Sequence, residues 1–96
     1  MQKINLNKKI KTLDGKIIQD GNEAITFKTV FLNLLGTYNA ENGKEAIQVY
    51  DLGIKINNYK QDEFNIEDAE KELLKKAIEK NKIYVSIVIA QVLKNL

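Results

Sequence analysis

The acidic side chains between residues 62 and 72 form the densest group in the chain that could do chemistry. They are Asp62, Glu63, Glu67, Asp68, Glu70 and Glu72. Carboxylates this close together could hold a metal ion or work as a general acid–base pair. Most of them fall where the first turns of a helix are expected, and acids there interact favourably with the helix dipole. We therefore expect a structural role, or an acidic patch that meets a basic partner.

The chain lacks the residues that nucleophilic catalysis, metal binding or phosphate binding would need. The 96 residues include no His and no Cys, and all fifteen basic residues are Lys. The single serine, Ser86, lies in an apolar run without a base to activate it. Gly43-Lys44 is followed by Glu45 rather than by the Ser or Thr of a phosphate-binding loop, and residues 14–22 miss the register of a calcium loop. We expect no catalytic residue, metal site or cofactor, and a protein that is not an enzyme.

The basic residues are concentrated at the start of the chain. Residues 1–16 contain five Lys and one Asp, although the net charge of the whole chain is only +2. Single-stranded nucleic acids are usually bound by basic surfaces that also carry aromatic stacking platforms, and residues 1–23 contain no aromatic side chain. We expect a solvated face or an electrostatic contact, with weak nucleic-acid binding as the less favoured alternative. The candidate residues are Lys8, Lys9, Lys11 and Lys16.

Two helices are expected in the first half of the chain. Apolar residues recur at helical spacing from about Ala24 to Tyr38, and Thr26 is a suitable N-cap. A second helix is expected to begin at Asn42 and to end near residues 57–58, with Glu45 as its capping-box partner. Its apolar residues cover more than one stripe, which predicts contacts on two sides.

The second half of the chain predicts two further helices. One begins with Asn65 as N-cap and Asp68 three residues later, and it ends near Asn81. The last segment, residues 82–96, is ambiguous. Its β-branched residues suit a buried strand, but its length and apolar spacing favour a helix.

Residues 1–23 are rich in turn-forming residues. Asp14-Gly15 lies between two short apolar runs, which is typical of a type I′ hairpin, and Asp20-Gly21-Asn22 is a second break. The fold class is therefore mostly α, a compact bundle of about four short helices with a small N-terminal β-hairpin. We expect a single domain over residues 1–96, with a basic hairpin region at 1–23 and a helical core at 24–96.

Several apolar residues lie outside the main helical stripes. They are Leu32, Ile83, Tyr84 and Ile87. Apolar coverage of this width on a small helix indicates burial on two sides. The second contact is either the N-terminal hairpin or another protein, and in the latter case these residues form a protein interface.

The stretch Thr12-Leu13-Asp14-Gly15-Lys16, followed by short helices and the apolar run 85–93, resembles a set of small phage and prophage accessory proteins. The resemblance implies a binding protein and transfers no catalytic or ligand-binding residue. Phage proteins of this kind inhibit host defence machinery, as anti-CRISPR proteins do, help particle or tail assembly, or bind nucleic acid.

The function expected from these observations is stoichiometric protein binding. The sharper hypothesis is an inhibitor of a bacterial defence nuclease, and the alternatives are a phage assembly or chaperone-like protein and a weak nucleic-acid-binding accessory protein. The expected partner is a host or phage protein, or a second copy of the chain. No membrane-spanning run is evident, and the expected location is the cytoplasm of a bacterial host.

Overall fold

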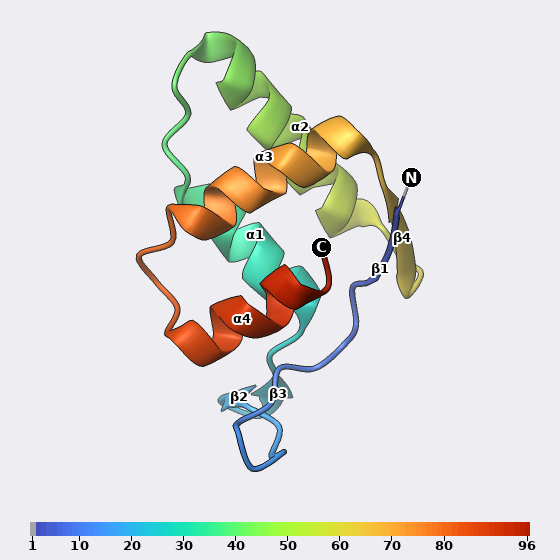
Figure 1. Cartoon of the computed structure of the whole chain (residues 1–96). Coiled ribbons are helices and arrows are strands. Elements are labelled where there is room, and N and C mark those ends of the chain that lie inside the picture. The colour runs from blue at the N-terminus through green and yellow to red at the C-terminus, as the bar shows by residue number, and fades with distance from the viewer. Residues whose placement is uncertain (1) are drawn as a thin grey trace.

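The computed structural model describes residues 2–96, which form four helices around one apolar core together with two small antiparallel strand pairs (Figure 1). The helices are α1 (Phe27–Thr37), α2 (Gly43–Asn58), α3 (Asp68–Glu79) and α4 (Ser86–Lys94). The strands are β1 (Gln2–Asn5), β2 (Gln19–Asp20), β3 (Glu23–Ala24) and β4 (Glu63–Ile66). The predicted fold class, a helical bundle with a small N-terminal hairpin, is confirmed.

Side-chain caps determine where α1 and α2 begin. Thr26 Oγ1 accepts a hydrogen bond from the Thr29 N–H at 3.4 Å, and Asn42 Oδ1 accepts one from the Glu45 N–H at 2.8 Å. Both N-caps are those that the sequence predicts, because a cap depends on residues three positions apart. The capping box predicted for α2 differs in its donor. The Glu45 carboxylate accepts the N–H of Glu41 and not that of the N-cap Asn42.

The predicted start of the third helix at Asn65 is wrong. Phe64 and Ile66 are buried and Asn65 is exposed, which is the alternation of a strand. This strand, β4, pairs with β1, so that Ile4 lies opposite Phe64. Helix α3 begins later, where Glu67 is the N-cap and forms a capping box with Glu70.

The ambiguous last segment forms a helix, as favoured from its spacing. Val88 and Val92, one turn apart on α4, are buried. Residues 82–85 precede the helix, and the Asn81 side chain orders them by accepting the N–H groups of Ile83 and Tyr84 at 2.9 and 2.8 Å.

The N-terminal hairpin is present, but its regular strand pair lies at the second turn signal. Strands β2 and β3 flank Gly21, whose φ is +66°. Around Asp14-Gly15 the chain forms only an isolated bridge between Lys11 and Ile17, with Gly15 at φ +87°. The two-residue type I′ turn predicted there is replaced by a wider loop, in which the Thr12 N–H donates to the Lys16 carbonyl at 2.7 Å.

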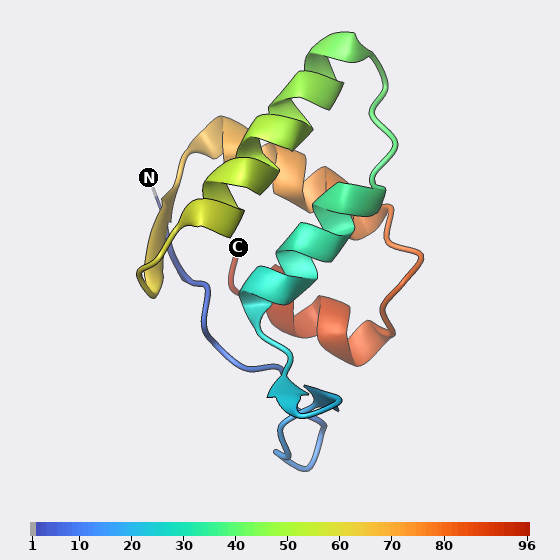
Figure 2. The ribbon, with the colours of Figure 1, turned by 180° about the vertical axis from the view of Figure 1, so that it is seen from behind.

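The four helices lie in two layers. Helices α3 and α4 are in front in Figure 1, and α1 and α2 are in front when the molecule is turned to show its other side in Figure 2. Residues from the predicted basic hairpin region also enter the core, because Ile4, Leu6 and Ile10 are buried against the helices. No helix within residues 2–96 has the length and apolar character needed to cross a membrane.

Candidate functional site

The acidic segment around the start of α3 is used for structure. Within residues 2–96, no three acidic side chains are grouped so that they could hold a metal ion. Glu70 Oε1 accepts the Glu67 N–H at 3.0 Å, and Glu70 Oε2 lies 3.0 Å from Lys55 Nζ. These carboxylates therefore cap α3 and attach it to α2.

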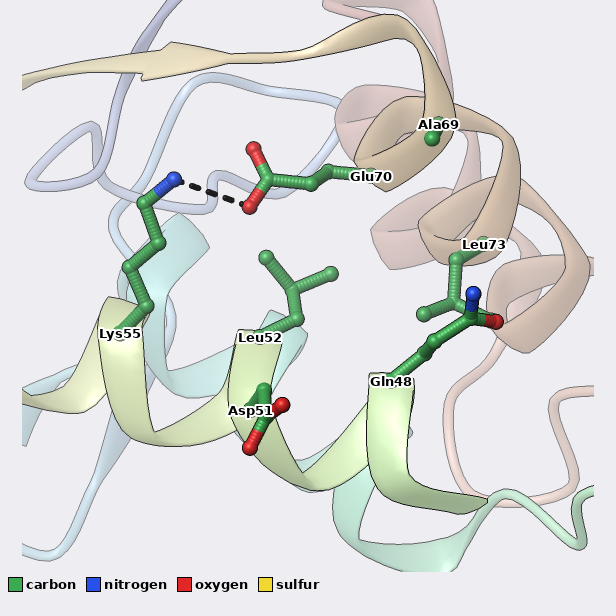
Figure 3. Close-up of a pocket in the computed structure, with 7 residues that line it drawn as sticks. All are labelled: Gln48, Asp51, Leu52, Lys55, Ala69, Glu70 and Leu73. Atoms are coloured by element: carbon green, nitrogen blue, oxygen red, sulfur yellow. Dashed lines mark hydrogen bonds and ion pairs between the residues drawn. The ribbon is translucent and has the colours of Figure 1, made fainter. Parts of the chain in front are cut away.

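A hollow of about 290 Å³ lies between α2 and α3 (Figure 3). Leu52 and Leu73 form its apolar floor, and the ion pair of Lys55 with Glu70 spans one end. Because Glu70 also caps α3, both members of this ion pair are already engaged with protein partners. We interpret this hollow as a joint between two helices and not as the site of function.

A second hollow, of about 460 Å³, lies between the N-terminal loop and α4. It is lined by Lys11, Thr12, Leu13, Ser86, Ile87, Ala90, Gln91 and Lys94. We call it the basic hollow. Leu13 is 89% exposed, so a large apolar side chain stands almost entirely in water beside the apolar surface of Ile87 and Ala90. Leaving such a side chain in water forgoes about 1.5–3 kcal/mol of burial free energy, which a bound partner would recover.

Gln91 determines the geometry of the basic hollow. Its Nε2 donates to the Lys11 carbonyl at 2.7 Å, and its Oε1 accepts the Lys11 N–H at 3.0 Å. The side-chain amide thus pairs with both backbone groups of one residue, as a neighbouring strand would. Gln91 also donates to the Ile87 carbonyl at 3.0 Å, which fixes its position on α4. These bonds hold the loop that carries Leu13 against the helix that carries Ile87.

The charge of the basic hollow comes from both ends of the sequence. Lys11 and Lys94 line it, and none of its eight lining residues is acidic or aromatic. Nearby, Lys8 Nζ donates to Asn95 Oδ1 at 3.4 Å, which again joins the N-terminal segment to the end of the chain. Lys16 lies on the same turn as Leu13 and forms an exposed ion pair with Asp14 at 3.8 Å. Lys9 is exposed on the strand-like segment that bridges to Thr26.

The four predicted interface residues lie in three places. Ile87 is half-buried and lines the basic hollow. Ile83 and Tyr84 lie in the connection before α4, where the Tyr84 hydroxyl accepts from Asn33 Nδ2 on α1 at 2.6 Å. Leu32 lies apart from them, in a hollow between α1 and α2. The structure therefore combines the predicted interface residue Ile87 with the predicted basic residue Lys11.

Leu13, Ala90, Gln91 and Lys94 line this site but are not among the candidate site residues of the sequence analysis. From the sequence, Leu13 can be assigned to one strand of a hairpin. It directly precedes the turn residues Asp14-Gly15, and this position at the tip of the turn is the signal that its side chain is exposed. Gln91 is a polar residue interrupting an apolar run, a pattern that signals a side chain with a specific hydrogen-bond partner. Its partner, Lys11, is 80 residues away in the sequence.

Comparisons of the chain with protein-family models, with curated proteins and with solved structures find no match.

Proposed function

We propose that the chain is a protein-binding module whose docking surface is the basic hollow. The single observation that carries the proposal is the nearly complete exposure of Leu13 beside Ile87 and Ala90, with lysines at the border. A partner that covers these residues gains apolar burial, and acidic groups on it would meet Lys11 and Lys94. The fitting partner is an acidic protein segment with apolar side chains.

The composition of the hollow favours a protein over a nucleic acid. Aromatic side chains supply much of the affinity of single-stranded nucleic acids, and none lines this surface. Leu13, Ile87 and Ala90 instead offer an aliphatic surface that matches leucine, isoleucine or phenylalanine side chains of a partner.

A selection from a random peptide library tests this proposal, because it does not require the partner to be identified first. The purified chain is expected to enrich peptides that combine Asp or Glu with large apolar residues, and their affinity is expected to fall with salt. Leu13→Ser with Ile87→Ser is expected to weaken binding of a selected peptide about 30-fold or more. Ile47→Ser, which replaces an exposed apolar side chain on α2 by serine, is the control and is expected to bind normally.

Two results contradict the proposal. One is a selection that enriches no acidic apolar sequence. The other is a selected peptide that binds the Leu13→Ser and Ile87→Ser variant as tightly as the wild type, with circular dichroism showing both proteins folded. A gel shift of single-stranded DNA at low salt that is lost on Lys8→Glu with Lys11→Glu would instead support nucleic-acid binding.

The finer proposal is that the bound protein is a bacterial defence nuclease, which the chain inhibits by contact. It is supported by the resemblance of residues 12–16 to phage accessory proteins, and this stretch contains Leu13. Adding the purified chain to such nucleases is expected to reduce cleavage in a stoichiometric manner. Unchanged cleavage at a large molar excess, with no co-purification of a defence component, rejects it.

A further inference from the structure

The outer side of α2 carries an apolar stripe that faces away from the core. Ile47, Tyr50 and Ile54 follow one another at helical spacing and are 64, 69 and 43% exposed. The core-facing side of the same helix is separate, since Leu52 and Ile56 are buried. Helix α2 therefore has apolar residues on two sides, as expected, but the contacts expected on both sides are found on only one of them within residues 2–96.

The stripe borders a hollow of about 440 Å³ between α1 and α2, the two helices that are in front in Figure 2. The hollow is lined by Leu32, Leu35, Gly36, Ala46, Val49, Tyr50, Gly53, Ile54 and Asn57. We call the hollow and the adjoining Ile47 the α1–α2 face. A Cβ atom placed on Gly36 or Gly53 would meet nothing within 4 Å, so the two glycines leave open space. The exposed Tyr50 and Ile54 side chains and this open space thus lie on one face.

All the residues of the α1–α2 face are uncharged. In a two-fold symmetric dimer each surface meets its own copy, so a charged face would place like charges together. The polar groups here are the Tyr50 hydroxyl and the Asn57 amide, and each can both donate and accept a hydrogen bond. Such groups can pair with their own copies, whereas a lysine or a carboxylate cannot.

We propose that a second copy of the chain docks on the α1–α2 face and forms a two-fold symmetric dimer. Tyr50 and Ile54 of one copy fill the open space over Gly36 and Gly53 of the other. A stable interface buries about 800 Å² per partner, which is close to an eighth of the 6338 Å² surface of the chain. Helix α2 alone is about 24 Å long at 1.5 Å per residue, so its outer side with α1 beside it provides a face of suitable length.

Sedimentation velocity and light scattering from micromolar to millimolar concentration test the dimer. The wild-type chain is expected to reach twice its mass of 11.0 kDa. Tyr50→Lys with Ile54→Lys places like charges across the symmetry axis and is expected to weaken association about 30-fold or more. Leu13→Lys makes a similar change on the basic hollow, and this control is expected to dimerise normally.

The absence of cysteine from the chain allows a second measurement. Ile54→Cys is expected to form a disulfide-linked dimer on mild oxidation, and Leu13→Cys is expected to form far less. A wild-type chain that stays monomeric at millimolar concentration overturns the proposal. So does a dimer that survives both lysine substitutions in a folded protein.

The dimer uses a different surface from the proposed function, so the two can fail independently. The Tyr50→Lys and Ile54→Lys variant is expected to bind a selected acidic peptide with wild-type affinity per chain. If the wild-type chain dimerises, it becomes a bivalent binder, and a partner with two acidic segments is held more tightly through effective concentration.

Discussion

The hydroxyl of Tyr38 donates a hydrogen bond to Oε1 of Glu45 at 2.7 Å, and this bond joins the end of α1 to the first turn of α2. Glu45 is only 8% exposed, which is unusual for a carboxylate. The Glu41 N–H at 3.1 Å and Lys76 Nζ at 3.3 Å complete its surroundings. The buried charge is therefore hydrogen-bonded and paired, and it connects the α1–α2 loop with α3.

Glu45 makes the free energy of unfolding of the domain depend on pH in the acid range. The Tyr38 hydroxyl, then the Glu41 N–H and Lys76, lower the pKa of the Glu45 carboxyl below its ordinary value. A lowered folded-state pKa contributes stability above the unfolded-state value of about 4.3, and this contribution is lost as the pH falls through the folded-state pKa. Urea unfolding at neutral and at strongly acid pH should show a smaller acid loss for Glu45→Gln than for the wild type. Equal losses in both proteins would contradict this role of Glu45.

The opposite effect is expected for Tyr38 in alkali. Its pKa is raised to about 12, first by the hydrogen bond to Glu45 and then by burial and the nearby acids. The bond therefore stabilises the fold below pH about 10 and ceases to do so between about 10 and 12. Tyr38→Phe should reduce the free energy of unfolding at pH 7 by about 1.5–3 kcal/mol, the range for a hydrogen bond to a charged group. Tyr50→Phe, on an exposed side chain, is the matched control and should change it by less than about 0.5 kcal/mol.

Local chemistry explains which parts of this fold could be predicted. The caps Thr26 and Asn42 act on residues three positions away, so their effect is readable from a short stretch of sequence. The pairing of β1 with β4 joins segments about 60 residues apart, and the short alternation of Phe64, Asn65 and Ile66 does not identify the pairing partner. Because Phe64 and Ile66 must both face the core, the strand overrode a plausible helix cap at Asn65.

The candidate site was predictable only in its parts. The sequence selected Lys11 for its charge and Ile87 for its position off the helical stripe, but their proximity depends on the pairing of Gln91 with the Lys11 backbone. Leu32 fulfilled the same sequence criterion as Ile87 and lies on the α1–α2 face. Apolar residues outside a stripe identify candidate surface positions, and the tertiary fold decides which of them share a surface.

The pairing of Gln91 with Lys11 can be tested directly. Gln91→Ala removes both bonds to the Lys11 backbone, and we expect the free energy of unfolding to fall by about 1–2 kcal/mol. Amide hydrogen exchange at Lys11 should become faster, and affinity for selected acidic peptides should fall because the Leu13 loop loses its anchor. Gln48→Ala, an exposed glutamine on α2, is the control. Unchanged exchange at Lys11 would show that the loop is held by other contacts.

Two glycines should respond to alanine in opposite directions. Gly21 has a φ of +66°, which strains any residue with a Cβ atom, so Gly21→Ala should destabilise the fold by about 1 kcal/mol. Gly53 lies inside α2 with open space at its Cβ position, and Gly53→Ala should stabilise the fold by about 0.5–1 kcal/mol. Thermal unfolding followed by circular dichroism measures both changes. A destabilising Gly53→Ala would mean that α2 does not have this surrounding space.

The basic N-terminal segment is also part of the folded core, and a pair of substitutions separates its two roles. Ile10 is fully buried, and its N–H donates to the Ile25 carbonyl at 2.9 Å. Ile10→Ala should lower the free energy of unfolding by about 2–4 kcal/mol, the cost of a cavity in a packed core. Leu13→Ala, three residues later on the exposed turn, should change it by less than about 0.5 kcal/mol. Urea unfolding of both variants measures the difference. If both substitutions changed the free energy of unfolding by similarly small amounts, the N-terminal segment would not be packed on the core. The expected difference would show that this segment is part of the core and positions Leu13 on the surface, where a partner can contact it.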